Sequence, residues 1–177
     1  MANYLFTSDR LGFRNWTMND LDDLYEMNST PQVMRHFPAT QRREECEAFI
    51  LRAQRHFQEH GFNYYAVDHL ASQECIGFTG LARQTYTAPF TPCTDIGWRL
   101  KEAHWGHGYA TEGAKACLLH AKHELGLNEI FAVAVKQNEA SINVMRKIGM
   151  QYHGNFFHPA LKDHPELAEC VVYRIEI

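Results

Sequence analysis

The stretch His104-Trp-Gly-His-Gly-Tyr-Ala-Thr-Glu-Gly113 decides the fold that we expect for this chain. It lies between a strand-like run, Asp95–Leu100, and a helical pattern that starts at Ala110. Gly106 and Gly108 can adopt positive φ and let the backbone approach a ligand closely. Because the free N–H groups and the positive dipole end of the following helix face the same space, the stretch predicts a loop that binds an anion such as a pyrophosphate.

This loop follows neither of the common nucleotide-binding motifs. No lysine comes directly after Gly108, as a Walker-type loop requires, and Thr111 stands where the dinucleotide fingerprint has its third glycine. An empty turn is the alternative, since glycines are common in strand-to-helix connections. The sequence therefore indicates either a phosphate loop of another kind or a turn without a ligand.

The hydrophobic periodicity changes after the loop. Apolar residues recur at helical spacing from Ala110 to Leu125, and Gly126 is placed to end the helix. The next run, Glu129–Val135, is nearly all apolar, which is typical of a central strand buried on both faces. Strand, helix and strand form a crossover unit, so we expect Asp95–Leu100 and Glu129–Val135 to be parallel, with a right-handed connection.

Three more strands are expected before the loop, at Leu11–Arg14, Tyr64–Asp68 and Cys75–Ala82. The polar turn His69–Glu74 predicts a hairpin of the last two. This hairpin and Asp95–Leu100 together predict an antiparallel meander of three consecutive strands.

Two helices are expected between the first two of these strands. Thr17 and Asp20 have the spacing of a capping box, and an apolar stripe over Leu21–Asn28 follows them. After an irregular segment with two prolines, Thr40 is placed to cap a second helix that stops at Gly61.

The C-terminal part adds one helix and two strands. Asn138 is the expected N-cap of a helix over Glu139–Ile148, and Gly149 is its stop signal. Strand-like runs follow at Gln151–Phe157 and Cys170–Ile177. The whole pattern predicts an α/β fold of the mixed α+β kind, a mostly antiparallel sheet with one parallel pair and flanking helices, in a single domain over residues 1–177.

Composition excludes several classes of protein. The formal net charge is −4 and the 17 basic residues are scattered, which argues against a nucleic-acid partner and suits a cationic amine. The five cysteines are far apart and form no C-x-x-C, and the pairs among the eleven histidines lack a third ligand, so no metal site is indicated. Neither a signal peptide nor a stretch of about 18 apolar residues is present, which predicts a soluble cytoplasmic protein without membrane contact.

Three motifs together carry a resemblance to a known family: W-G-H-G-Y-A-T-E-G at Trp105–Gly113, N-E-A-S at Asn138–Ser141, and K-I-G-M at Lys147–Met150. Nearly the whole chain resembles the GNAT (GCN5-related N-acetyltransferase) superfamily, and within it the branch of RimJ/RimL-type ribosomal-protein N-terminal acetyltransferases. The loop of that family is usually Q/R-x-x-G-x-G/A. Trp105 departs from the superfamily pattern in its first place but is familiar in this branch, and Gly108 and Ala110 match the fourth and sixth places.

The resemblance implies a GNAT-like acyl-CoA N-acyltransferase fold, with two parallel strands that splay apart, and acetyl-CoA as cosubstrate without a metal. The loop would hold the pyrophosphate through backbone N–H groups, and the strand before it would bind the pantetheine arm. Gly97 is consistent with a bulge in that strand. The implied cofactor-binding residues are Trp98, Arg99, Leu100, Gly106, His107, Gly108, Tyr109, Ala110, Thr111, Asn138 and Ser141.

Two candidates for catalysis occupy matching family positions. Asp95 lies where the family often carries a carboxylate and would act as general base, directly or through water, although a solvated strand-edge aspartate is the alternative. Ser141 would protonate the departing CoA thiolate or donate a hydrogen bond to it. The alternative is that Asn138 and Ser141 only cap a helix. Glu112 is expected to interact with the helix dipole or to accept a local hydrogen bond.

The resemblance implies an N-acetyltransferase in which a primary amine attacks acetyl-CoA directly in a ternary complex, and the N-terminal α-amine of a ribosomal protein is the leading acceptor. Neither Cys93 nor Cys117 has the histidine pairing that a covalent acyl-cysteine would need. The alternatives are a small-molecule acetyltransferase for polyamines, aminoglycosides or amino acids, and a non-catalytic CoA-binding module. The sequence is compatible with a homodimer but does not fix the oligomeric state.

Overall fold

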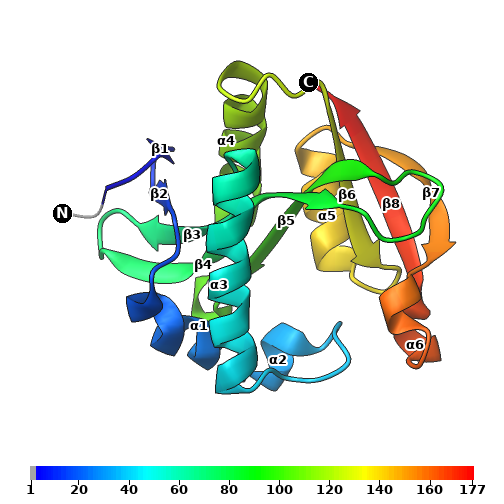
Figure 1. Cartoon of the computed structure of the whole chain (residues 1–177), viewed down its shortest axis with the longest axis horizontal. Helices are drawn as coiled ribbons and strands as arrows, with labels where there is room; N and C mark the ends of the chain where they lie inside the picture. The colour runs from blue at the N-terminus through cyan, green and yellow to red at the C-terminus, as the bar shows by residue number, and fades with distance from the viewer. Residues whose placement is uncertain (1–2) are drawn as a thin grey trace.

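One mixed sheet with helices on both faces makes up residues 3–177, the part of the chain that the computed structural model describes (Figure 1). Its eight strands lie in the order β1-β2-β3-β4-β5-β6-β8-β7. The strands are β1 (Phe6–Thr7), β2 (Leu11–Arg14), β3 (Tyr64–His69), β4 (Glu74–Gln84), β5 (Cys93–Leu100), β6 (Glu129–Val135), β7 (Gln151–Phe157) and β8 (Glu169–Glu176). The helices are α1 (Leu21–Asn28), α2 (Pro31–Met34), α3 (Arg43–His60), α4 (Tyr109–His123), α5 (Glu139–Lys147) and α6 (Pro165–Ala168), with 3-10 turns η1 (Met18–Asp20), η2 (Glu102–His104) and η3 (Pro159–Leu161).

The antiparallel meander is confirmed. Strand β3 pairs antiparallel with β2 and with β4, and β4 pairs antiparallel with β5. Strand β1 was not expected from the sequence. It pairs Phe6 with Phe13 of β2 and is only two residues long, so it is too short to display a strand periodicity.

Strands β5 and β6 are the expected parallel pair, and α4 connects them. Their registered contact is Asp95 opposite Phe131. Strand β6 is paired along its whole length with β8 on its other side. Since β5 continues to Leu100 and β6 to Val135 without a further registered pair between them within residues 3–177, the two strands separate toward their C-terminal ends.

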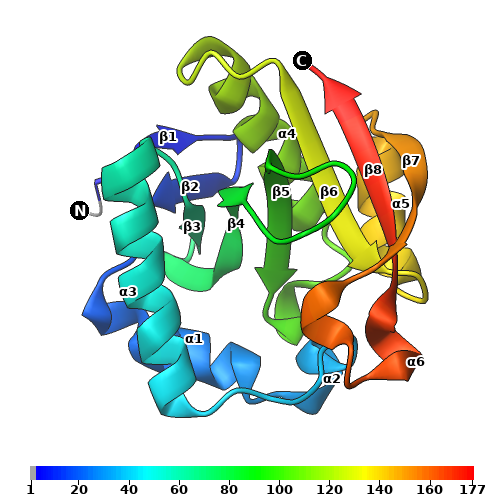
Figure 2. The same cartoon turned by 45° about the vertical axis from the view of Figure 1, so that its right-hand side comes forward.

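The two faces of the sheet carry separate apolar cores. On one face α4 packs its buried stripe, which contains Ala114, Cys117 and Ala121, against β2 to β6. On the other face α1 and α3 bury Leu24 and Ile50 against the sheet. Figure 2 shows α1 and α3 on the near side of the strands and α4 beyond them. Each of these helices therefore packs on the sheet through its apolar stripe, and the packing removes that stripe from water.

The start of α3 differs from the expectation that Thr40 caps it. The helix begins at Arg43, and Arg42 is its N-cap, because the Glu45 carboxylate accepts a 2.7 Å hydrogen bond from the Arg42 N–H. The Gln41 N–H meanwhile donates to the Asn28 carbonyl at 2.9 Å and holds the preceding residues away from the helix. The end of the helix is confirmed, since Gly61 adopts the left-handed conformation at φ +79°.

The five cysteines are buried free thiols. Among residues 3–177, no three side chains of His, Cys, Asp or Glu come together as a group that could hold a metal ion. No helix of this part of the chain has the length and the apolar character needed to cross a membrane.

Candidate active site

A cleft of about 810 Å³ opens where β5 and β6 separate. Its walls include β5 after Asp95, the C-terminal end of β6, the loop before α4 and the first turn of α5. The sequence-predicted site residues that line it are Asp95, Trp98, Arg99, Leu100, Gly106, Gly108, Tyr109, Ala110, Thr111, Asn138 and Ser141. His107 is the one predicted residue that does not line this cleft.

The glycine loop has the backbone conformation that the sequence predicts. Gly106 has φ +78° and Gly108 has φ +82°, and Gly108 is the N-cap of α4. A Cβ built on Gly106 would meet no other atom within 4 Å, so the space beside this glycine is open. The first-turn N–H groups of α4 have no partner inside the helix and are available to an anion in the cleft.

Trp105 anchors this loop to the strand that precedes it. Its indole Nε1 donates a 2.9 Å hydrogen bond to the Leu100 carbonyl at the end of β5. The Arg35 guanidinium lies 5.7 Å from the Trp105 ring centroid and covers the indole from the α2 side. The tryptophan therefore holds the loop to β5, although a superfamily pattern would place a polar residue there.

His107 lies outside the lining of the cleft and packs against Tyr109, which borders it. The His107 ring stacks on Tyr109 at 5.6 Å, and its Nδ1 lies 2.8 Å from the Trp105 carbonyl oxygen. Tyr109 is 9 % exposed and lies under the guanidinium of Arg10 at 4.5 Å. His107 can therefore offer its backbone N–H to a ligand and not its ring.

Asp95 is a buried carboxyl at the mouth of the diverging strands. Its Oδ1 accepts a 2.7 Å hydrogen bond from the Tyr64 hydroxyl, and its Oδ2 accepts a 3.0 Å bond from the Gln84 amide. Burial raises the pKa of Asp95 to about 6, although these two hydrogen bonds act in the opposite direction. A carboxyl with this pKa is ionised at neutral pH and lies close to the range in which a general base works best.

No sequence pattern indicated Tyr64 and Gln84 as partners of Asp95. They lie on β3 and β4, and only the strand register brings them to β5. Gly97 is consistent with a bulge in the sequence, but β4 and β5 pair regularly there, with Gly80 opposite Gly97. A Cβ on Gly97 would lie 3.1 Å from the Tyr64 ring, so the glycine lets the ring pass over β5.

Alternate residues after Asp95 point to opposite faces of the sheet. Trp98 and Leu100 pack with the α4 core, whereas Arg99 points to the α1 side and donates to Asn28 Oδ1 at 2.9 Å. Between them the backbone of β5 borders the cleft. This is the segment that the resemblance assigns to the pantetheine arm.

Asn138 and Ser141 lie together at the start of α5. The Asn138 Oδ1 accepts a 3.2 Å hydrogen bond from the Ser141 N–H, which confirms Asn138 as the N-cap. The Ser141 Oγ makes no hydrogen bond to any other group of residues 3–177, and Ser141 lines the cleft. Capping thus uses the backbone of Ser141 and leaves its hydroxyl available.

Glu112 is held by the turn between β1 and β2. Its carboxylate accepts hydrogen bonds from the Ser8 hydroxyl at 2.7 Å and from the Arg10 N–H at 2.9 Å, and it forms an ion pair with the Arg10 guanidinium at 2.6 Å. These contacts tie the turn between β1 and β2 to the first turn of α4. Glu112 is therefore a hydrogen-bond acceptor, but its partners are 102 and 104 residues away in the sequence and not local as expected.

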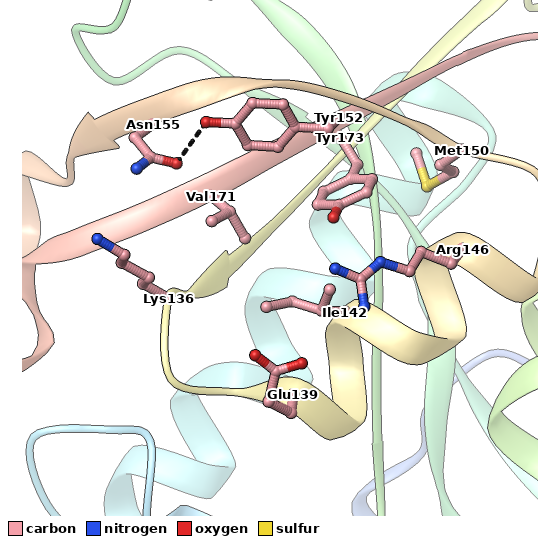
Figure 3. A pocket seen from close by; sticks show the side chains of 9 residues that line it. All are labelled: Lys136, Glu139, Ile142, Arg146, Met150, Tyr152, Asn155, Val171 and Tyr173. Carbon is pink, nitrogen blue, oxygen red and sulfur yellow. Dashed lines mark hydrogen bonds between the residues drawn. The ribbon is translucent and has the colours of Figure 1, made fainter.

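A second hollow, of about 600 Å³, lies between α5 and the strands β7 and β8 (Figure 3). It includes Lys136, Glu139 and Arg146, and the Tyr152 hydroxyl on its rim donates a 2.8 Å hydrogen bond to Asn155 Oδ1. None of the sequence-predicted site residues lines it. We therefore take the cleft between β5 and β6 as the candidate site.

The fold thus combines a cleft between two diverging strands with a helix N-terminus that carries two positive-φ glycines on its wall. The family model of the acetyltransferase (GNAT) domain matches residues 10–151, so the chain belongs to the GNAT acetyltransferase family. It is an acetyl-CoA-dependent N-acetyltransferase.

One curated relative and two solved structures illustrate what the chain is similar to. The uncharacterized N-acetyltransferase YnaD of Bacillus subtilis is 27 % identical over 156 residues, which cover 85 % of this chain and 84 % of YnaD. RimL, a ribosomal L7/L12 α-N-protein acetyltransferase, superposes with a TM-score of 0.81 at 16 % identity, over 100 % of this chain and 96 % of RimL. The spermidine N-acetyltransferase of Vibrio cholerae, in complex with CoA and spermine, superposes with a TM-score of 0.74 at 16 % identity. The match covers 94 % of this chain and 95 % of the spermidine enzyme. These two neighbours share the fold and act on different kinds of amine.

Proposed function

We propose that this enzyme acetylates the N-terminal α-amine of a protein by direct attack within a ternary complex. The observation that carries the proposal is the buried Asp95, whose carboxyl has a pKa of about 6 and borders the cleft. Asp95 accepts the proton that the amine loses as the new C–N bond forms. Ser141 Oγ donates a proton to the CoA sulfur as the C–S bond breaks, and solvent then replaces that proton.

The cleft fits acetyl-CoA, which supplies the acetyl thioester. Gly106 and Gly108 leave open space at the N-terminus of α4, and this supports backbone N–H contacts to the pyrophosphate over residues 106–111. Over Trp98–Leu100, β5 pairs with β4 on one side and, within the described part of the chain, has no registered pair with β6 on the other, and this free side supports binding of the pantetheine arm. Asn138 would position Ser141 through the cap at the start of α5.

Direct attack is further supported by the cysteines. Cys170 lines the cleft, and burial raises the pKa of its thiol to about 11. Burial likewise raises the pKa of Cys93 to about 11. Because the thiolate is the nucleophile in acyl-cysteine chemistry, thiols that stay protonated at neutral pH do not favour that route.

The choice of a protein N-terminus as the leading acceptor rests on the Trp105–Gly113 motif, which resembles that of the ribosomal-protein N-terminal acetyltransferases. The test is release of CoA thiol from acetyl-CoA with a panel of short peptides that carry a free N-terminus. The matched controls are the same peptides with a formylated N-terminus, and polyamines form a separate arm. We expect turnover with free N-termini alone. Turnover with polyamines and none with peptides would overturn this acceptor, and no turnover with any amine would overturn the proposal as a whole.

A further inference from the structure

Arg99 places a positive charge in the cleft without a carboxylate partner. Its Nη1 donates to the side-chain oxygen of Asn28 at 2.9 Å, and this acceptor is neutral. Its Nε is buried and has no hydrogen-bond partner within residues 3–177. No ion pair of this part of the chain includes Arg99. A partly buried cation without a counter-ion is unfavourable, and no carboxylate of the described residues neutralises the charge of Arg99.

Aromatic rings hold the guanidinium in place. The Arg99 Cζ lies 4.1 Å from the centroid of Phe37 and 5.3 Å from that of Phe78. Burial lowers the pKa of Arg99 to about 10, so the group stays charged at neutral pH. Rings stabilise a cation far less than an anion does, and they leave the planar donors of the guanidinium free to bind a carboxylate with two hydrogen bonds.

The residues around the cleft do not supply the missing anion. Asp95 is the one carboxylate among its lining residues, and its oxygens already accept hydrogen bonds from Tyr64 and Gln84. Asp95 also lies four positions away along β5, which separates the Cα atoms of the two residues by about 13 Å at 3.3 Å per residue. Arg35 and Lys147 add two further cations to the lining. The wall of the cleft is therefore positive although the whole chain has a net charge of −4.

The pyrophosphate of acetyl-CoA is also unsuited to be the anion that pairs with Arg99. The loop at Gly106–Thr111 and α4 belong to the side of the sheet on which Trp98 packs. Arg99 faces the opposite side, together with Asn28 and Phe78. An anion that reaches Arg99 must therefore enter from the side of α1 to α3, where the acceptor is expected.

We propose that the acceptor amine carries a carboxylate that pairs with Arg99 while its amino group faces Asp95, an assignment that rests on the proposed amine transfer. Asp95, Gly97 and Arg99 share one face of β5, so both groups of the acceptor can lie along a single strand. The carboxylate comes from a free amino acid or from an acidic side chain near a peptide N-terminus. The positive wall disfavours polyamines.

The test compares acids with their neutral counterparts at saturating acetyl-CoA. One arm uses peptides that have Glu or Gln at the second or third position, and the other uses free amino acids and their amides. We expect the acid of a pair to have the higher kcat/KM, by roughly 30-fold to 5,000-fold, the range for losing one partner of a buried charge pair. The arm in which this preference is found identifies the source of the carboxylate.

Variants connect the preference to Arg99. In Arg99→Met the ratio of acid to neutral acceptor should fall toward 1, mainly through KM of the acid, and Arg99→Lys should restore part of it. Arg35→Met is the matched control, because Arg35 covers Trp105 of the cofactor loop. It should change the KM for acetyl-CoA and leave the acid preference intact.

The outcomes separate this inference from the proposed function. Equal turnover of acids and neutral acceptors by the wild type overturns the carboxylate assignment and leaves amine transfer standing. If no amine is acetylated, amine transfer is wrong, and calorimetric titration of the same peptides into the CoA-loaded enzyme still tests Arg99. Equal affinity for Glu and Gln peptides in that titration overturns the assignment. If Arg99→Met does not fold, the wild-type comparison decides alone.

Discussion

The Tyr64 hydroxyl reaches Asp95 across an intervening strand, with its oxygen 2.7 Å from Asp95 Oδ1. Tyr64 stands opposite Gly80 on β4, and Gly80 stands opposite Gly97 on β5. Because both of these positions are glycine, no side chain stands between the tyrosine ring and the carboxyl. The row Tyr64–Gly80–Gly97 thus positions a hydrogen-bond donor on the proposed base.

Asp95→Asn should lower kcat/KM by roughly 10²-fold to 10⁴-fold, the usual contribution of a general base. The wild-type rate should rise with pH through the pKa of about 6, because only the ionised carboxylate accepts a proton. The Asn variant should lack this acidic limb. The measurement is kcat/KM between pH 5 and 9. A variant with the wild-type rate and pH profile would show that another group, or a water chain, removes the proton.

The same substitution should stabilise the protein at neutral pH. The folded-state pKa of Asp95 is raised above its ordinary value, so between the two values the native state binds more protons than the unfolded chain. Stability therefore falls as pH rises through this window. Asp95→Asn removes that loss and should increase the free energy of unfolding at pH 7 by up to about 3 kcal/mol, at 1.36 kcal/mol per pKa unit. Urea unfolding at pH 7 and pH 4 measures this gain, which should be small at pH 4, just above the ordinary pKa of 3.8. An equal gain at both pH values would contradict it.

Tyr64→Phe tests the hydrogen bond without removing the ring that packs 5.5 Å from Phe78. The hydroxyl donates to the ionised carboxylate and lowers its pKa, so its loss should raise the pKa of Asp95 further. The acidic limb of kcat/KM should move to higher pH, with the rate recovered on the alkaline side. Gln84→Leu removes the other donor and should move the limb the same way. A limb that stays in place or moves to lower pH would exclude this role.

The local parts of the site could be predicted from the sequence, because glycines and caps act within a few residues. Gly106 and Gly108 have positive φ, and Asn138 caps α5, as their neighbours in the chain indicated. The side-chain contacts that surround Asp95 and Arg99 could not be predicted. Tyr64 is 31 residues from Asp95, and Asn28 is 71 residues from Arg99. Such contacts depend on strand register and helix docking, which a period-2 pattern does not specify across long connections.

Gly108→Asp should abolish measurable binding of acetyl-CoA, since the carboxylate would occupy the pyrophosphate site and repel it. The variant should still fold. A Cβ at this position has only Arg10 Nη2 nearby, at 3.7 Å, and aspartate tolerates the φ of +82° better than most residues. Gly108→Asn is the matched control, with the same size and no charge, and it should retain part of the affinity. Calorimetry on both variants measures this, and an unchanged affinity in folded Gly108→Asp would remove the loop from the cofactor site.

Ser141→Ala separates a chemical role from a structural one. The cap of α5 uses the Ser141 N–H, which alanine keeps, and the Oγ bonds to nothing else within residues 3–177. The variant should therefore keep the wild-type melting temperature and acetyl-CoA affinity. If the hydroxyl assists the departing thiolate, its interaction strengthens in the transition state, so kcat and kcat/KM should fall together.

Asn138→Ala provides the opposite pattern as a control for Ser141→Ala, because it removes the cap acceptor itself. It should lower the free energy of unfolding by about 1 kcal/mol. Its kcat should fall only as far as Ser141 is displaced from its place beside the cleft. Melting temperature, acetyl-CoA affinity and kcat are measured on both variants. If Ser141→Ala melts earlier and keeps its kcat, the hydroxyl stabilises the helix and takes no part in proton transfer to the sulfur.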